Sequence, residues 1–157
     1  MPKPVLQAMV LADNVYVDAA TGKHVIAGTF TGIVTQPKTI PTEESSEGDP
    51  GRVVRIVEPR QMGSPCLYLA LFEVHGEVPI ELRYVDLADS SVLFRAAVTL
   101  RADDPVDVAE YAIPVPKLPV HKAGDFSLDA LYEEEVLGSW RISVKRLENP
   151  SHEGGLR

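Results

Sequence analysis

The stretch Ser91–Arg101, which reads SVLFRAAVTLR, alternates apolar and polar residues along its length. One face would carry five apolar side chains: Val92, Phe94, Ala96, Val98 and Leu100. The opposite face would carry three polar ones: Arg95, Thr99 and Arg101. Successive side chains of a β-strand point to opposite sides of a sheet, so this pattern predicts a strand with one buried face.

Patterns typical of β-strands recur along the chain, and no helical period interrupts them. The same alternation covers Ile80–Tyr84 and Ser139–Lys145. The more apolar run Cys66–Val74 predicts a central strand that is covered on both faces. Val5–Val17 is long enough for two short strands, or for one bent strand broken near Asp13 and Asn14. The remaining predicted strands are His24–Ile33, Asp107–Val115, Phe126–Tyr132 and a short edge strand at Val53–Val57.

The links between these strands favour a sandwich over a barrel. Gly22, in the link Asp18–Lys23, supplies the positive φ of a tight turn, so Val5–Val17 and His24–Ile33 are predicted to form a hairpin. Pro114–Pro119 is too rich in proline for a ladder and suits a crossover from one sheet to the other. We therefore expect an all-β fold, a two-layer antiparallel β-sandwich of about eight strands.

A chain of 157 residues has the size of one ordinary domain. We expect a single sandwich over residues 1–147, with a long excursion loop at 36–65. That loop contains the polar stretch Thr42–Asp49, which cannot bury enough apolar surface to offset its ordering entropy. The tail 148–157 holds a proline and two glycines and is predicted to be flexible.

Charge and cysteine content restrict the function classes. The net charge of −8 argues against nucleic acid and against acidic membrane surfaces as partners. Cys66 is the single cysteine, so no intramolecular disulfide can form. The N-terminus lacks the pattern of a signal peptide, and the apolar runs are far shorter than the roughly 20 residues of a membrane span. We expect a cytoplasmic protein.

Three stretches together resemble a bacterial family of small β-proteins without an assigned function. The first is Ala12–Asp18 with Thr21–Lys23 and Ile26–Phe30. The second is Gly76–Leu82 with Val85 and Asp86, and the third is Ala123–Phe126 with Glu134–Gly138. The likeness extends from about Val5 to Val144 and consists of turn and core residues. It implies a sandwich of the immunoglobulin-like or C2-like kind, and it transfers no active residues.

Loop carboxylates are the first candidates for ligand chemistry. Asp86 and Asp89 lie in one link, and Asp103, Asp104 and Asp107 lie in the next. Clustered loop carboxylates can hold calcium in a sandwich. However, two links that follow successive strands should lie at opposite ends of the sheet, and Asp is also a routine turn former. We favour the turn-forming interpretation and keep calcium or small-ligand binding as the alternative.

The other candidate groups do not form a catalytic signature. His24, His75, His121 and His152 share no metal-ligand spacing with one another or with Cys66, which is expected to be a buried, inert thiol. Ser139 is predicted on a strand, without the strand-turn-helix context of a nucleophile elbow, and Ser64 precedes a proline in a loop. Pro116–Pro119 matches a PxxP ligand, although the crossover explains it better. Core packing is the expected role of the scattered aromatic residues Tyr16, Tyr68, Tyr84, Tyr111, Tyr132 and Trp140.

The sequence thus predicts a non-catalytic β-sandwich interaction module with no catalytic, cofactor or metal-binding residues. It would act through an edge strand, a sheet face or the long acidic loop. We expect an unknown protein as partner, neither nucleic acid nor membrane, and a monomer or a weak homo-oligomer.

Overall fold

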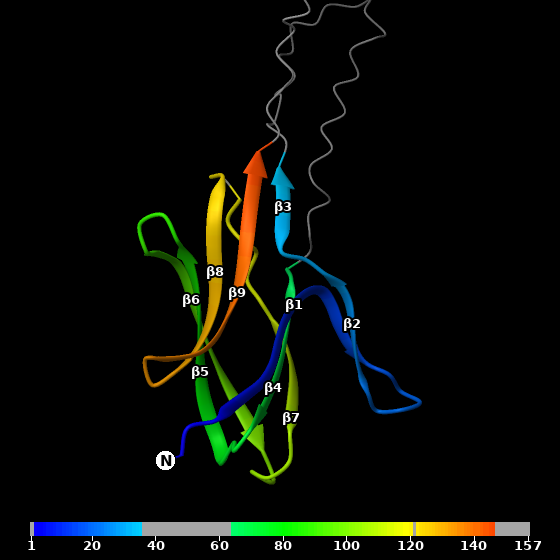
Figure 1. Cartoon of the computed structure of the whole chain (residues 1–157). Helices are drawn as coiled ribbons and strands as arrows, with labels where there is room; N and C mark the ends of the chain where they lie inside the picture. The colour runs from blue at the N-terminus through cyan, green and yellow to red at the C-terminus, as the bar shows by residue number, and fades with distance from the viewer. Residues whose placement is uncertain (1, 36–63, 121, 147–157) are drawn as a thin grey trace, which may run out of the picture.

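The computed structural model describes residues 2–35, 64–120 and 122–146. Nine strands form two sheets within these residues, and Figure 1 shows their arrangement. The predicted edge strand Val53–Val57, nearly all of the excursion loop 36–65 and the tail 148–157 lie outside the described residues. The all-β prediction is confirmed, with nine strands where about eight were expected.

The four-stranded sheet is antiparallel throughout. Its order is β2 (His24–Thr29), β1 (Val5–Val17), β4 (Cys66–Phe72) and β7 (Ala109–Pro114). The hairpin predicted around Gly22 is present, because β1 pairs with β2 from Ala12 opposite Thr29 to Val17 opposite His24. Gly22 has a φ of 70°, the conformation for which glycine is suited.

The five-stranded sheet contains one parallel pair, so the prediction of a purely antiparallel sandwich is wrong. Its order is β3 (Gly32–Thr35), β9 (Glu135–Arg146), β8 (Gly124–Tyr132), β5 (Gly76–Asp86) and β6 (Ser91–Ala102). Strand β3 runs parallel to β9, from Gly32 opposite Ser143 to Thr35 opposite Arg146. The other three pairs are antiparallel.

The predicted single strand His24–Ile33 is in fact two strands in different sheets. The chain leaves β2 after Thr29 and enters β3 at Gly32. The connecting residues are held by the C-terminal strand: the Trp140 Nε1–H donates to the Phe30 carbonyl over 2.9 Å, and the Ser143 N–H donates to the Thr31 carbonyl over 2.8 Å. Apolar periodicity cannot show such a switch, because it does not report which strand a segment pairs with.

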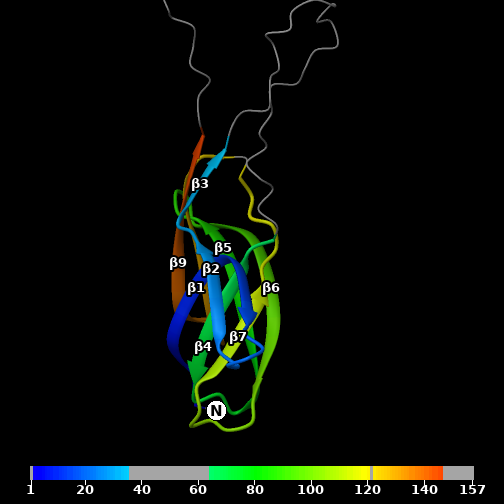
Figure 2. The ribbon, with the colours of Figure 1, turned by 90° about the vertical axis from the view of Figure 1, so that its right-hand side faces the viewer.

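Strand β1 is continuous, which confirms the bent-strand alternative for Val5–Val17. Its first part, up to Ala12, pairs with β4, and its part from Ala12 onward pairs with β2. The second part curls back with β2 over the outer face of β4 and β7, as the two views in Figures 1 and 2 show together. The backbone of Val15 accordingly reaches the sulfur of Cys66 on β4. The four-stranded sheet is therefore strongly curled.

The core lies between the inner faces of the two sheets. Tyr84 is fully buried at its centre, with its ring stacked between Phe94 and Phe126 at centroid distances of 5.4 and 5.3 Å. Such stacking contributes about 0.5–1.5 kcal/mol beyond the burial of area. Leucine and isoleucine side chains that are completely inaccessible surround it: Leu11, Leu67, Leu69, Leu71, Ile80, Leu82, Leu128 and Ile142.

The link Pro114–Pro119 crosses between the sheets as predicted, whereas Tyr16 lies outside the core. The chain passes from β7 to β8 through Val115–Val120, so Pro114–Pro119 does cross from one sheet to the other. The expectation that Tyr16 packs in the core is wrong, because this side chain is 49% exposed on the β1–β2 hairpin. The hairpin curls away from the interior, and Tyr16 faces solvent for that reason.

We expect Gly28→Ala to destabilise the fold by about 1–2 kcal/mol, because Gly28 has a left-handed φ of 74°. A Cβ atom there would also lie 2.5 Å from Asp13 Oδ2, across the bend of β1. Urea unfolding measures the loss. Gly32→Ala is the control, because its Cβ would meet only Ser143 O at 3.9 Å. Equal losses in the two variants would contradict the role of Gly28.

Candidate functional site

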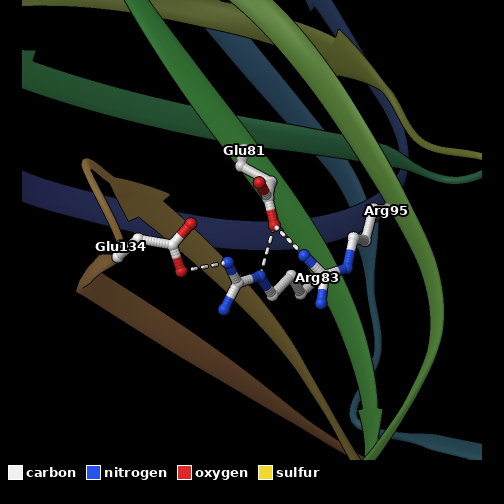
Figure 3. A network of polar contacts seen from close by, with 4 residues as sticks. All are labelled: Glu81, Arg83, Arg95 and Glu134. Carbon is white, nitrogen blue, oxygen red and sulfur yellow. Dashed lines mark hydrogen bonds and ion pairs between the residues drawn. The ribbon is translucent and has the colours of Figure 1, made fainter.

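The outer face of the five-stranded sheet carries a network of four charged side chains, drawn in Figure 3. Glu81 and Arg83 occupy alternate outward positions on β5, and Arg95 lies opposite Arg83 on β6. Glu134 comes from the turn between β8 and β9, where Glu133 and Glu134 both have positive φ. That turn conformation matches the twist of a tight hairpin and directs Glu134 over β5.

Arg83 donates hydrogen bonds to both carboxylates of the network, those of Glu81 and Glu134. Its Nη2 donates to Glu134 Oε2 over 2.7 Å, and its Nε donates to Glu81 Oε1. These hydrogen bonds, with Glu134 first, raise the pKa of Arg83, and in return Arg83 lowers the pKa of Glu134. The Arg83 side chain is 17% exposed, but Glu134 is 79% exposed, so solvent still screens this ion pair.

Arg95 is left with weaker compensation. Its Nη1 lies 3.7 Å from Glu81 Oε1, which is beyond hydrogen-bonding distance, and its side chain is 57% exposed. Two like charges directly opposite each other on paired strands repel, and Glu81 offsets the repulsion between Arg83 and Arg95. The network therefore presents one well-paired arginine and one arginine able to accept a further carboxylate.

A second polar cluster lies where the β1–β2 hairpin folds over the four-stranded sheet. Tyr68 on β4 donates its hydroxyl to Glu110 Oε1 on β7, and His24 Nδ1 at the start of β2 lies 3.3 Å from Glu110 Oε2. The rings of His24 and Tyr68 are 5.7 Å apart. Burial, followed by the hydrogen bond to Glu110 and then by the charge of Glu110, raises the pKa of Tyr68 to about 12. This cluster fastens the hairpin to the sheet.

Cys66 also lies beneath the hairpin and is partly buried. Burial raises the pKa of its thiol, which is the opposite of what an activated nucleophile requires. The predicted burial is found only in part, because Cys66 lies half-buried on the outer side of β4, and the inertness of its thiol stays a prediction. The prediction that β4 is covered on both faces is confirmed in its middle, where the outward-facing Ala70 is 1% exposed.

The loop carboxylates do not converge. The link after β5 lies at one end of the β5–β6 pair, where Asp86 opposes Ser91, and the link after β6 lies at the other, where Gly76 opposes Ala102. The predicted placement at opposite ends is confirmed. Asp86 accepts the Ala88 N–H over 2.9 Å and the Lys122 ammonium over 3.0 Å, which together lower its pKa.

Two other loop aspartates act in the same way as Asp86. Asp89 Oδ1 accepts the Ser91 N–H, and Asp104 Oδ1 accepts the Val106 N–H, each over 2.9 Å. These are the local turns that the sequence favours for aspartate. Within residues 2–35, 64–120 and 122–146 no three His, Cys, Asp or Glu side chains come together as a metal site.

The remaining candidates stay apart from one another. His75 contacts Glu73 at 3.3 Å in the link between β4 and β5, whereas His24 belongs to the hairpin cluster. His121 and His152 lie outside the described residues. Ser139 is on strand β9, as predicted, and Ser64 precedes β4. Among the described residues, no helix is long and apolar enough to cross a membrane.

Comparison with known proteins assigns no family. No model of a known protein family matches the chain, and no curated protein sequence matches it. The resemblance to a bacterial family of β-proteins therefore stays a prediction.

Both polar clusters escaped the sequence analysis. The alternation of Glu81 and Arg83 showed that these side chains face outward, but not that Glu134 reaches them from a turn. The cluster of His24, Tyr68 and Glu110 joins three strands and depends on the curl of β1. No local pattern encodes such a contact, because it follows from the register and curvature of the whole sheet.

The raised pKa of Tyr68 gives a test of the hairpin cluster. An unfolded tyrosine titrates near 10, so the folded state holds this proton more tightly. The free energy of unfolding contributed by Tyr68 is fully present below about pH 10 and is lost as the pH rises toward 12. We expect denaturant titrations to show a smaller loss over this range in Tyr68→Phe than in the wild type. An identical loss in both proteins would contradict the assignment.

Proposed function

We propose that this protein is a non-catalytic interaction module that binds a protein partner along the free edge of β6. The observation that supports this proposal is the length of that edge. β6 spans Ser91–Ala102 and is the last strand of the five-stranded sheet, and among the described residues it pairs only with β5. It runs along one side of the molecule in Figure 2. An exposed edge of this length is a template for a further strand.

The backbone of β6 offers hydrogen-bonding groups in a defined order. The Tyr111 hydroxyl on β7 donates to the Arg101 carbonyl over 2.9 Å, so this carbonyl points away from β5. In an antiparallel pair, residues that point away from the partner strand alternate with residues that bond to it. Arg95, Ala97 and Thr99 therefore direct both their N–H and C=O groups toward the free edge.

The side chains of β6 also support the pairing of its free edge with a further strand. Phe94, Ala96 and Val98 point toward the core but are only partly buried, whereas Leu100 is 5% exposed. An added strand would cover the partly buried ones. Natural edge strands are often blunted by proline or kept short, and β6 has neither protection.

We also propose a cytoplasmic location and a family for the protein. A cytoplasmic location is supported by the single cysteine, which can form no intramolecular disulfide. Membership of the bacterial β-protein family, and an immunoglobulin-like or C2-like ancestry of the two sheets, rest on the quoted turn and core residues. The calcium alternative has less support, because the described aspartates Asp86, Asp89 and Asp104 are engaged in turns.

Amide hydrogen exchange tests the alternation along β6. We expect the N–H groups of Arg95, Ala97 and Thr99 to exchange rapidly, and those of Phe94, Ala96 and Val98 to be protected by their bonds to β5. Exchange measured residue by residue with nuclear magnetic resonance decides this. Uniform protection across Arg95–Thr99 would mean that the edge is already occupied.

Blocking the edge tests the function itself. Ala97→Pro removes one outward N–H at a position where an edge strand tolerates proline, and Ala97→Val keeps that N–H as the matched control. After cross-linking in the native host, we expect a set of proteins that Ala97→Val retains and Ala97→Pro loses. Equal capture by two variants with equal melting temperatures would overturn the proposal.

A further inference from the structure

We propose that the edge of β6 selects an extended acidic segment of its partner, with carboxylates that face Arg95 and Arg101 and apolar residues between them. This inference rests on the proposed function and names the chemistry of the partner. It follows from two properties of β6 that the fold does not need: an outward face of one charge sign and an inward face left partly uncovered.

The charge on β6 has one sign. Within Ser91–Ala102 the charged residues are Arg95 and Arg101, and there is no acidic residue. On the neighbouring strand, Glu77 lies opposite Arg101, whereas Glu81 is already hydrogen-bonded to Arg83 and reaches Arg95 only at 3.7 Å. A carboxylate on a strand beyond β6 would therefore meet Arg95 from its open side. At physiological salt the attraction acts over about 8 Å, within the reach of directly opposed side chains.

The inward face selects for apolar residues at alternate positions. Phe94 and Val98 are packed against the core cluster and are only partly buried. Residues of an added strand that lie opposite these two would cover them and extend the core. Since side chains of a strand alternate between faces, the acidic and apolar requirements fall on different positions of the same segment.

Self-pairing of two copies fits these observations less well. If two β6 strands paired antiparallel with Ala97 opposite itself, Arg95 of one copy would lie diagonally beside Arg101 of the other. Shifting the centre to Val98 would place those two arginines directly opposite each other, which is destabilising. The arginines thus discourage a second copy and favour an acidic strand.

The spacing of the two arginines on β6 defines the spacing of the carboxylates in the partner segment. Arg95 and Arg101 are six positions apart on the same face, so the two carboxylates of the partner should also be six positions apart. The probe that follows is a seven-residue peptide, Glu-Val-Thr-Val-Thr-Val-Glu, whose symmetry suits either strand direction. Its control is Lys-Val-Thr-Val-Thr-Val-Lys, which has the same backbone and the same apolar positions.

The decisive experiment is a charge exchange. We expect the wild-type chain to bind the Glu peptide about tenfold more tightly than the Lys peptide, and Arg95→Glu/Arg101→Glu to reverse that preference. Arg95→Lys/Arg101→Lys should keep the preference of the wild type, and melting temperatures establish that all variants are folded. Binding should slow the exchange of the Ala97 amide, which shows that the peptide adds to the edge.

The outcomes separate this inference from the function on which it rests. If the charge exchange leaves the peptide preference unchanged while Ala97→Pro still loses its captured proteins, the acidic motif is overturned and the edge function stands. If neither peptide protects the Ala97 amide and Ala97→Pro captures what Ala97→Val captures, both are overturned. A dimer that dissociates in Ala97→Pro, with no peptide binding, would replace the acidic segment by a second copy.

Discussion

Strand β1 changes its partner at Ala12, and the shape of the four-stranded sheet depends on that change. Ala12 pairs with Cys66 on one side and with Thr29 on the other, and it is completely buried. Up to Ala12, β1 pairs with β4, and from Ala12 onward β1 pairs with β2. A strand that continues beyond its first neighbour can bend freely, and β1 bends over the sheet that it has just left. Val15 covers the outer side of β4 for this reason.

The bend of β1 also determines which cluster of charged side chains is covered and which is exposed. On the four-stranded sheet the hairpin brings His24 to Tyr68 and Glu110: the Tyr68 hydroxyl donates to Glu110, and His24 Nδ1 lies 3.3 Å from Glu110 without a hydrogen-bond partner among the described residues. Nothing folds over the corresponding part of the five-stranded sheet in the described residues. Arg83 is balanced there by two carboxylates, and Arg95 remains exposed at the edge. The same alternation of side chains thus yields a closed polar cluster on one sheet and an open one on the other.

The positions of the strands could be predicted from the sequence more readily than the way in which the strands assemble into sheets. Strands β4 to β9 lie close to where the period of two and the turn residues predicted them, because both signals are local. The switch from β2 to β3 was missed, since the bonds that hold Phe30 and Thr31 come from β9, far along the chain. Tyr16 was misplaced in the core because its exposure depends on the bend of β1. The candidate edge needed the sheet order, and the order is a property of the whole fold.

The parallel pairing of β3 with β9 has a consequence for how the protein is made. Phe30 and Trp140, which are hydrogen-bonded to each other, are separated by 110 residues. During synthesis β3 leaves the ribosome long before β9 exists, whereas the β1–β2 hairpin can close at once. Contacts of such sequence separation form late, because their loop-closure entropy is lost before they contribute any stability. The five-stranded sheet is thus completed only after β9 has left the ribosome, and a nascent chain arrested before β9 carries β3 as an unpaired strand.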